Sequence, residues 1–370
     1  MMQSFVSLSI VTVIWFFVGY SLCFSGDMTS GTDFFGILGN FDKSMLLSVD
    51  MNSDFNQDLP EFVFFLYQMM FAIITPALIT GAFADRVDFK AYLIFLIGWL
   101  FLVYFPFVHM IWGGGILAEL GVLDFAGGIV VHATAGFAAL ASVFFVGKRK
   151  DRSGLHSIPL VALGTGLLWF GWYGFNAGSE LAVDRITIVA FLNTDLAASV
   201  AGLTWLLLAW IFERKPKFVG LLTGMVAGLA TITPAAGFVS PQSAVLIGFL
   251  AGVVCYGAIW VKNHLGWDDA LDVWGVHGIG GVLGTICLGI FAEEAINAVA
   301  VNGGLLSGNI SFFVIQVLAV VVAVTWAFAF TFAMLYVIDR FTPIRVAEDV
   351  EINGLDAGIH GEAAYEQGAF

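Results

Sequence analysis

Hydrophobic residues follow one another in long runs along most of this chain, and short polar stretches separate the runs. Ten of these runs are about 20 residues long, which is the length that an α-helix needs to cross a bilayer. Their approximate bounds are 4–24, 61–83, 91–111, 126–146, 157–177, 187–211, 218–236, 244–262, 270–292 and 309–338. The pattern therefore predicts an all-α polytopic membrane protein with about ten transmembrane helices in a lipid bilayer.

The composition agrees with this prediction. Of the 370 residues, 59% are hydrophobic and 11% are charged, whereas soluble domains carry roughly 25% charged residues. The formal net charge of −14 argues against a nucleic-acid partner, because nucleic acid is bound by basic patches. The three cysteines, Cys23, Cys255 and Cys287, lie in apolar runs, so we expect buried thiols and no disulfide framework.

Lysines and arginines indicate the orientation in the membrane. If the N-terminus is cytoplasmic, the inner loops hold twelve of them and the outer loops hold two, Lys43 and Arg185. Positive charge is typical of cytoplasmic loops, and an even number of spans then places both termini in the cytoplasm. The long outer loop, residues 25–60, carries six aspartates and one lysine. It is either a solvated cap or a funnel that concentrates cations at an entrance.

Two glycine-rich runs carry a histidine at the same distance from an aspartate. Asp124 precedes His132 by eight residues, and Asp269 precedes His277 by eight. The two helices are predicted to cross the membrane in opposite directions. This indicates an inverted repeat, which in transporters places a site near the bilayer midplane. We therefore expect His132 and His277 to meet in the middle of the protein.

A histidine at membrane depth is costly and indicates a functional site. Two neutral imidazoles can share an N–H···N hydrogen bond, accept one from a polar solute, or pass a proton. Two core histidines, each bonded to a backbone carbonyl, are the structural alternative. No third histidine or cysteine is expected at the same depth, so a metal site is disfavoured. A bis-histidine haem stays open at this point.

Aromatic residues cluster at the predicted outer ends of the third and fifth spans. Trp112 precedes three glycines, residues 169–179 contain four large aromatic side chains besides Trp169, and Phe71 lies halfway down the second span. An interfacial aromatic belt is the ordinary explanation for tryptophan at such places. Tryptophan faces beside glycines and a serine also suit a small cation, and phenylalanines below them suit a hydrophobic constriction.

Four motifs occur in the order HMIWGGG, LDFAGGIVVH, GLLWFGWYGFNAGSELA and DVWGVHGIGGVLGT. With these motifs the chain resembles the ammonium transporter (Amt) branch of the Amt/Rh family over nearly its whole length. The resemblance implies an inverted-repeat fold with a central pore, selective transport of ammonium or ammonia, no enzymatic activity and no cofactor. Residues 1–5 align with the start of the second family helix, so the usual first helix has no counterpart in this sequence.

The resemblance also implies roles for individual residues, matched motif by motif. The ammonium-binding site would consist of Phe71, Trp112 and Ser179, and the gate of Phe71 and Phe175. The pore would be lined by His132, His277 and Trp172. Asp124 would give structural support to the outer site from behind. Asp269 and Asp272 are also assigned structural support, because their place at the cytoplasmic mouth predicts helix capping, with contact to the ion as the alternative.

Two domains and several partners follow from the same resemblance. Residues 1–338 would form the transmembrane transport domain, and residues 339–370 a cytoplasmic tail. The protein would be a homotrimer in a plasma membrane (the inner membrane of a bacterium), would accept methylammonium as an analogue, and would contact a PII-type regulatory protein through its tail. An ammonium sensor that uses the same pocket, and a bis-histidine haem protein, are the alternatives.

Overall fold

The computed structural model describes residues 1–50, 52–56, 59–150 and 154–363. Asp58 and Arg152, which the loop charges above include, lie outside the described residues, as do residues 364–370 of the predicted tail. The N-terminus and the described end of the tail lie at one end of the molecule, because Met1 and Met2 line a pocket together with Asp356 and His360. We call this end the inner end and the opposite one the outer end, following the predicted orientation.

Nine helices among the described residues are long and apolar enough to cross a membrane. Short turns of 3₁₀- or π-helix, labelled η, interrupt or extend several of them. The nine spans are Met2–Phe24 (α1, η1, α2), Glu61–Ile79 (α3), Phe89–Glu119 (α4, η3, α5, α6), Gly128–Val146 (η4, α7), Ile158–Glu180 (α8, η5), Arg185–Glu213 (α9), Pro241–Leu265 (α11), Trp274–Phe291 (η6, α12) and Ile310–Ile338 (α13). A tenth apolar helix, Phe218–Ile232 (α10), is shorter. The prediction of about ten transmembrane helices is confirmed.

The elements within these spans, and those outside them, have the following bounds: α1 Met2–Ile14, η1 Trp15–Gly19, α2 Tyr20–Phe24, η2 Ser44–Leu46, β1 Asp54–Asn56, β2 Leu59–Pro60, α4 Phe89–Trp99, η3 Leu100–Tyr104, α5 Phe105–Trp112, α6 Ile116–Glu119, η4 Gly128–Ala133, α7 Thr134–Val146, α8 Ile158–Ala177, η5 Gly178–Glu180, η6 Trp274–Gly278, α12 Ile279–Phe291, η7 Leu305–Ser307, α14 Glu348–Asn353 and η8 Asp356–His360. The two short strands pair antiparallel in the long outer loop.

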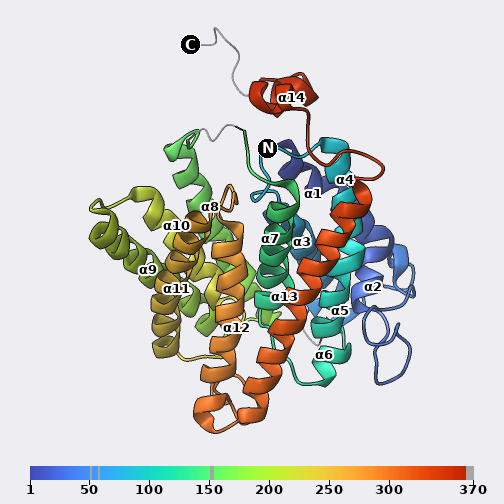
Figure 1. The fold of residues 1–370 in the computed structure, drawn as a ribbon. Helices are drawn as coiled ribbons and strands as arrows, with labels where there is room; N and C mark the ends of the chain where they lie inside the picture. Colours follow the sequence, from blue (N-terminus) through green and yellow to red (C-terminus); the bar gives the residue numbers. More distant parts are fainter. Residues whose placement is uncertain (51, 57–58, 151–153, 364–370) are drawn as a thin grey trace.

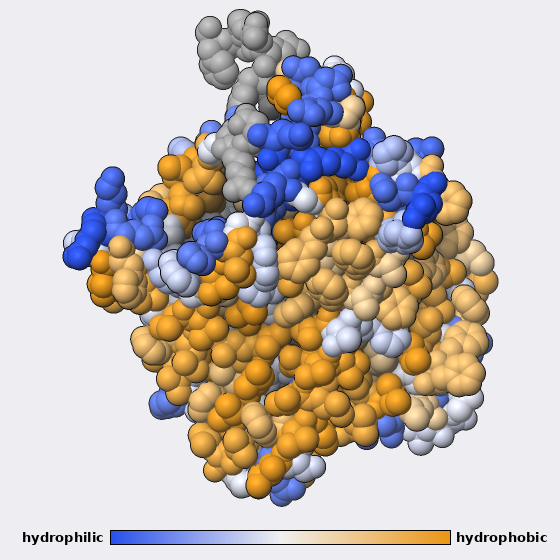
Figure 2. All heavy atoms as spheres, viewed as in Figure 1, coloured by the Kyte–Doolittle hydropathy of each residue, from blue (hydrophilic) through white to orange (hydrophobic). Residues whose placement is uncertain are grey.

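The spanning helices form two groups that lie side by side (Figure 1). One group contains α1 to α5, α7 and α13, the other contains α8 to α11, and α12 lies between them. A broad hydrophobic belt surrounds the helices, and the hydrophilic surface concentrates at the inner end (Figure 2). On α8 the side chains of Leu163, Leu167 and Phe170 are 58%, 63% and 77% exposed. Faces of this kind need a cover of lipid or protein.

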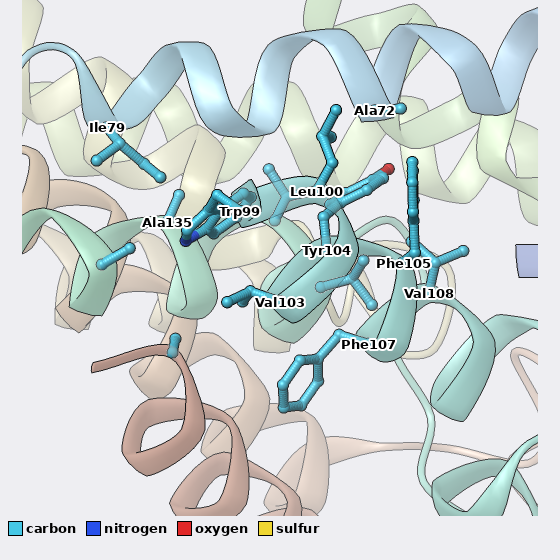
Figure 3. Close-up of a cluster of buried hydrophobic side chains, with 14 of the residues drawn as sticks. Ala72, Ile79, Trp99, Leu100, Val103, Tyr104, Phe105, Phe107, Val108 and Ala135 are labelled. Carbon is cyan, nitrogen blue, oxygen red and sulfur yellow. The ribbon is translucent and has the colours of Figure 1, made fainter. Parts of the chain in front are cut away.

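The first group has a dense aromatic core near α4 and η3. Trp99, Leu100 and Tyr104 are fully buried, and Figure 3 shows them next to Ala72 and Ile79 of α3 and Ala135 of α7. The indole nitrogen of Trp99 donates a hydrogen bond of 3.1 Å to the hydroxyl of Thr331 in α13. A buried indole needs such a partner, so this bond fixes α4 against α13.

Two glycines allow α7 and η6 to touch at the centre. A Cβ atom placed on Gly136 would lie 2.1 Å from the Cα of Gly278, a distance that no side chain tolerates. Glycines at such a crossing let two backbones approach closely. At the inner end, the backbone N–H of Arg149, just beyond α7, donates to Asp268, just before η6. The two helices therefore run in opposite directions, as the inverted repeat predicts.

A buried cluster of charges closes the inner end of this helix pair. Arg86, which looks like an ordinary loop charge in the sequence, is fully buried and donates to the Asp268 carboxylate at 2.9 Å. Arg149 binds the same carboxylate at 2.8 Å. Burial opposes ionisation of Asp268, but the hydrogen bonds from Arg149 and the charge of Arg86 outweigh it and lower its pKa to about 2. The cluster joins three loops through one carboxylate.

The described part of the tail packs against the inner loops. Arg345 donates to the backbone carbonyls of Val146 at 3.1 Å and Lys148 at 2.7 Å, and it forms an ion pair of 2.8 Å with Glu351. The backbone N–H of Asp88 donates to Ile344 at 2.9 Å. The tail therefore begins as an ordered segment that contacts the loops after α3 and α7.

Candidate functional site

An aromatic cleft of about 590 Å³ lies at the outer end. Phe71, Trp112 and Ser179, the three residues predicted to bind ammonium, all line it. They come from α3, α5 and η5, three elements that are far apart in the sequence. The fold therefore brings the predicted site residues together in one cavity.

The position of Trp112 depends on the loop that precedes the first histidine helix. Its indole nitrogen donates a hydrogen bond of 2.8 Å to the backbone carbonyl of Asp124. The carboxylate of Asp124 in turn accepts four backbone N–H groups, those of Gly127, Gly128, Ile129 and Val130, at 2.7–3.1 Å. Burial raises the pKa of Asp124 and the four N–H groups act against this. Asp124 thus caps η4 and holds the wall of the cleft.

Ser179 has a partner, Tyr67, that none of the sequence motifs includes. The hydroxyl of Tyr67 lies 3.0 Å from the Ser179 hydroxyl and donates to the carbonyl of Phe175 at 2.8 Å. Ser179 itself donates to that carbonyl at 2.8 Å. Tyr67 precedes Phe71 by four residues on α3, and residues at this spacing share a helix face. That spacing was the available signal for Tyr67.

Phe71 and Phe175, the two residues predicted to form a gate, are in ring contact at the bottom of the cleft. Their ring centroids are 4.4 Å apart with an interplanar angle of 38°. Phe71 also meets Trp112 edge to face, with centroids 5.8 Å apart. Its side chain is only 2% exposed, so the two rings separate the cleft from what lies beneath.

The two histidines lie behind the phenylalanines and face each other. Their Nδ1 atoms are 3.3 Å apart and their ring centroids 5.2 Å apart. His132 stacks on Phe175 at 5.9 Å and on Trp172 at 5.4 Å, and the indole of Trp172 donates to Thr233 at 3.0 Å. The Nε2 atom of His132 has no hydrogen-bond partner among the described residues. The arrangement leaves this nitrogen available to a small polar molecule.

Each histidine lies on a turn of π-helix, His132 on η4 and His277 on η6. Such turns often occur at functional sites. The carboxylate of Asp269 accepts the backbone N–H of Trp274 at 2.8 Å, at the start of η6. We also expected Asp272 to cap a helix, but its carboxylate instead accepts a hydrogen bond of 2.5 Å from the Lys262 side-chain nitrogen Nζ. The equivalent positions of the two repeats therefore carry a capping aspartate before each histidine turn.

The geometry of the pair disfavours a haem. The two Nδ1 atoms are 3.3 Å apart and in direct contact. An iron held between two imidazoles needs about 2 Å to each nitrogen, and therefore about 4 Å between the two nitrogens. The part of the chain that the structure describes also contains no group of three histidine, cysteine or acidic side chains suited to a metal ion.

The long outer loop is anchored through some of its charged residues. Asp33 contacts His109 Nε2 at 3.0 Å, and the other ring nitrogen of His109 contacts the carbonyl of Cys23 at 3.0 Å. Lys43, the lysine of this loop, pairs with Glu61 at 2.6 Å. Asp33 is therefore part of a structural contact, and not every acidic residue of the loop serves as a free surface charge.

The fold and the site define a polytopic α-helical membrane protein in which an aromatic cleft leads through a phenylalanine pair to two buried histidines. The family model described as Ammonium Transporter Family matches residues 1–365. The chain belongs to this family.

Individual relatives agree with the family. The chain is 43% identical to the putative ammonium transporter of Methanothermobacter thermautotrophicus, over 98% of this chain and 88% of the relative. Among solved structures, Candida albicans Mep2 has a TM-score of 0.86 and 36% identity, over 93% of this chain and 78% of that one. A structure described as a sensor Amt protein has a TM-score of 0.87 and 32% identity, over 97% and 89%. These likenesses confirm the predicted ammonium-transporter fold.

Proposed function

We propose that this protein transports ammonium across the membrane and that the cleft, the phenylalanine pair and the histidine pair act in succession. One observation carries the proposal: an unbroken series of ring contacts leads from Trp112 through Phe71 and Phe175 to His132 and His277. Membership of the Ammonium Transporter Family supports the substrate.

Recruitment takes place in the outer cleft. Aromatic faces attract a cation through their quadrupoles, and Trp112 and Phe71 present two rings to the cavity. The hydroxyl of Ser179 accepts a hydrogen bond from the N–H groups of ammonium. Potassium has no N–H to donate, so this contact favours ammonium over potassium.

Deprotonation takes place near the phenylalanine pair. A charge at the centre of a bilayer costs at least about 2.5–3.5 kcal/mol, and the rings of Phe71 and Phe175 offer no hydrogen bond to replace water. Ammonia, which is neutral, avoids this cost once ammonium has passed its proton to a water molecule in the outer cleft, which opens to the outer solution. Beyond the gate, the free Nε2 of His132 and the His277 ring give it polar partners in an otherwise apolar path.

The test is uptake of labelled methylammonium by cells that lack their own ammonium transporters. The double variant His132→Leu, His277→Leu should lose uptake, while the matched control His264→Leu should keep it, because His264 lies at the inner end of α11 and stacks on Trp260. Immunoblots of the membranes show whether each variant is present in equal amount. Undiminished uptake by the double variant would overturn the role of the histidines.

An ammonium sensor that uses the same cleft is the second candidate function, and the likeness to the sensor Amt protein supports it. The two functions differ in flux: a transporter moves methylammonium at a rate that restores growth on low ammonium, whereas a sensor binds it without restoring growth. Growth rescue by the wild-type chain therefore decides between them.

We also propose the assembly and regulation that the resemblance implies. The exposed apolar face of α8 suits contact between copies in a homotrimer within a plasma membrane. The ordered start of the tail, fixed by Arg345 and Glu351, gives a PII-type protein a defined approach to the inner loops. Mass measurement of the detergent-solubilised protein, alone and mixed with such a protein, tests both.

A further inference from the structure

Glu180 lies in the outer cleft, and none of the roles above includes it. It is the last residue of η5, follows Ser179 directly, and lines the cavity together with Trp112 and Phe71. Its side chain is half-buried. Because the residue after it, Leu181, turns into the left-handed region at φ 58°, the short helix ends here and Glu180 stays beside Ser179.

The carboxylate of Glu180 is uncompensated. Over the described residues, no side chain or backbone N–H donates a hydrogen bond to it, and no lysine or arginine forms an ion pair with it. The nearest charge that influences it is another carboxylate, Asp184, which caps α9. Acidic side chains are mostly exposed to water, so a half-buried carboxyl group without a partner is a place in the cleft where a cation can bind.

The other acidic residue of the cleft differs in this respect. Asp124 uses both carboxylate oxygens to accept backbone N–H groups, so its charge serves the fold. A second unused acceptor is the side-chain carbonyl Oε1 of Gln68, a residue only 7% exposed that lines the same cavity, and this oxygen has no partner among the described residues. The residues that line the cleft therefore include two acceptors that the protein itself leaves unsatisfied, the Glu180 carboxyl group and the buried Gln68 Oε1.

We propose that Glu180 is an affinity-determining residue of the cation site, and that its carboxylate, with Gln68 Oε1, draws a small N–H-bearing cation into the cleft and accepts hydrogen bonds from it. The proposal rests on the proposed function and deepens it. A carboxylate in a cleft with low-dielectric walls raises the local concentration of cations, and a cation bound beside it favours its ionised form. Charge-assisted hydrogen bonds then hold ammonium between the carboxylate and the aromatic rings.

A charge that acts before the gate affects binding more than the later steps. Removing it should raise the substrate concentration for half-maximal uptake and leave the maximal rate nearly unchanged, the pattern expected for a contact that is equal in the ground state and the transition state. A purely structural role predicts something else: less protein in the membrane and a lower maximal rate.

The experiment compares Glu180→Gln with Glu180→Asp and with Asp54→Asn in proteoliposomes that contain the purified full chain. Asp54 is an exposed carboxylate of β1 in the same outer loop region and does not line the cleft, so its variant removes the same charge from the same end. The measured quantity is the concentration of methylammonium for half-maximal uptake, at low ionic strength because salt screens such attraction.

We expect Glu180→Gln to raise this concentration about fivefold, the effect of one charge about 4 Å from an ion in water-like surroundings. Glu180→Asp keeps the charge and should stay within about twofold of the wild type. An unchanged value in Glu180→Gln, or an equal rise in Asp54→Asn, would overturn the proposal, since the charge would then act as general surface potential or not at all.

Failure of the proposed function is distinguishable from failure of this inference. If the wild-type chain takes up no methylammonium, transport is refuted, and calorimetric titration of the detergent-purified protein with methylammonium chloride then tests Glu180 alone. Weaker binding by Glu180→Gln than by the wild type supports the role, and equal binding or none in either protein overturns it.

Discussion

Replacing Asp124 with asparagine tests whether one carboxylate holds both the cleft and the first histidine turn. The side chain accepts four backbone N–H groups at the start of η4. Asparagine keeps one acceptor oxygen but turns an NH₂ group toward the N–H donors that the other oxygen served. Two of the four bonds are therefore lost.

The size of the effect follows from these bonds. Hydrogen bonds to charged groups contribute about 1.5–3 kcal/mol each, so two lost bonds correspond to about 3–6 kcal/mol before any relaxation. The loop is also the anchor of Trp112, whose indole donates to the Asp124 carbonyl. We therefore expect Asp124→Asn to lower the stability and to raise the methylammonium concentration for half-maximal uptake.

The assay is thermal unfolding of the detergent-purified protein, followed by tryptophan fluorescence, together with uptake. Asp54→Asn is the control, because it makes the same chemical change at an exposed position. A melting midpoint and an uptake curve that both match the wild type would refute the reasoning, since they would mean that the four bonds are dispensable.

Two further predictions concern the centre and the inner end. Gly136→Ala should prevent recovery of monodisperse protein, because its Cβ would lie 2.1 Å from the Gly278 backbone; Gly164→Ala, with open space around it, is the control in gel filtration. Burial raises the pKa of Asp269 to about 6, so the folded state holds a proton that the unfolded state loses near pH 3.9. The wild type should lose about 3 kcal/mol of stability as the pH rises from about 4 to about 6, and melts of Asp269→Asn at stepped pH should lack this loss.

The spans could be predicted from the sequence because hydrophobicity and length are local properties. Some helices are shorter than their runs: α10 ends at Ile232, before the end of its run, 218–236, since the chain turns there. There Pro234 packs against Gly128, whose added Cβ would lie 2.4 Å from the proline ring. This contact joins residues about a hundred positions apart in the sequence. The hydropathy of the run therefore cannot predict where α10 ends.

The site residues were predictable where a motif or a repeat marks them, and not where their partners are distant. The spacing of eight from Asp124 to His132 and from Asp269 to His277 identified a pair that is in contact. Tyr67, in contrast, acts through a hydroxyl whose partners follow more than a hundred residues later. Arg86 looked like a loop charge, because nothing in its neighbourhood indicates that Asp268 buries it.

The inverted repeat preserves the position of the capping carboxylate but not its bonding. Asp124 uses both oxygens to hold the start of η4, whereas Asp269 gives one oxygen to the Trp274 N–H and leaves Oδ1 without a partner among the described residues. The Lys262 Nζ atom contacts the Asp269 backbone carbonyl at 3.0 Å and the neighbouring Asp272 carboxylate. It therefore forms its hydrogen bonds with these two groups and not with the Asp269 carboxylate. The same eight-residue spacing thus precedes two histidines that are in contact with each other, and burial raises the pKa of the Asp269 carboxyl group to about 6.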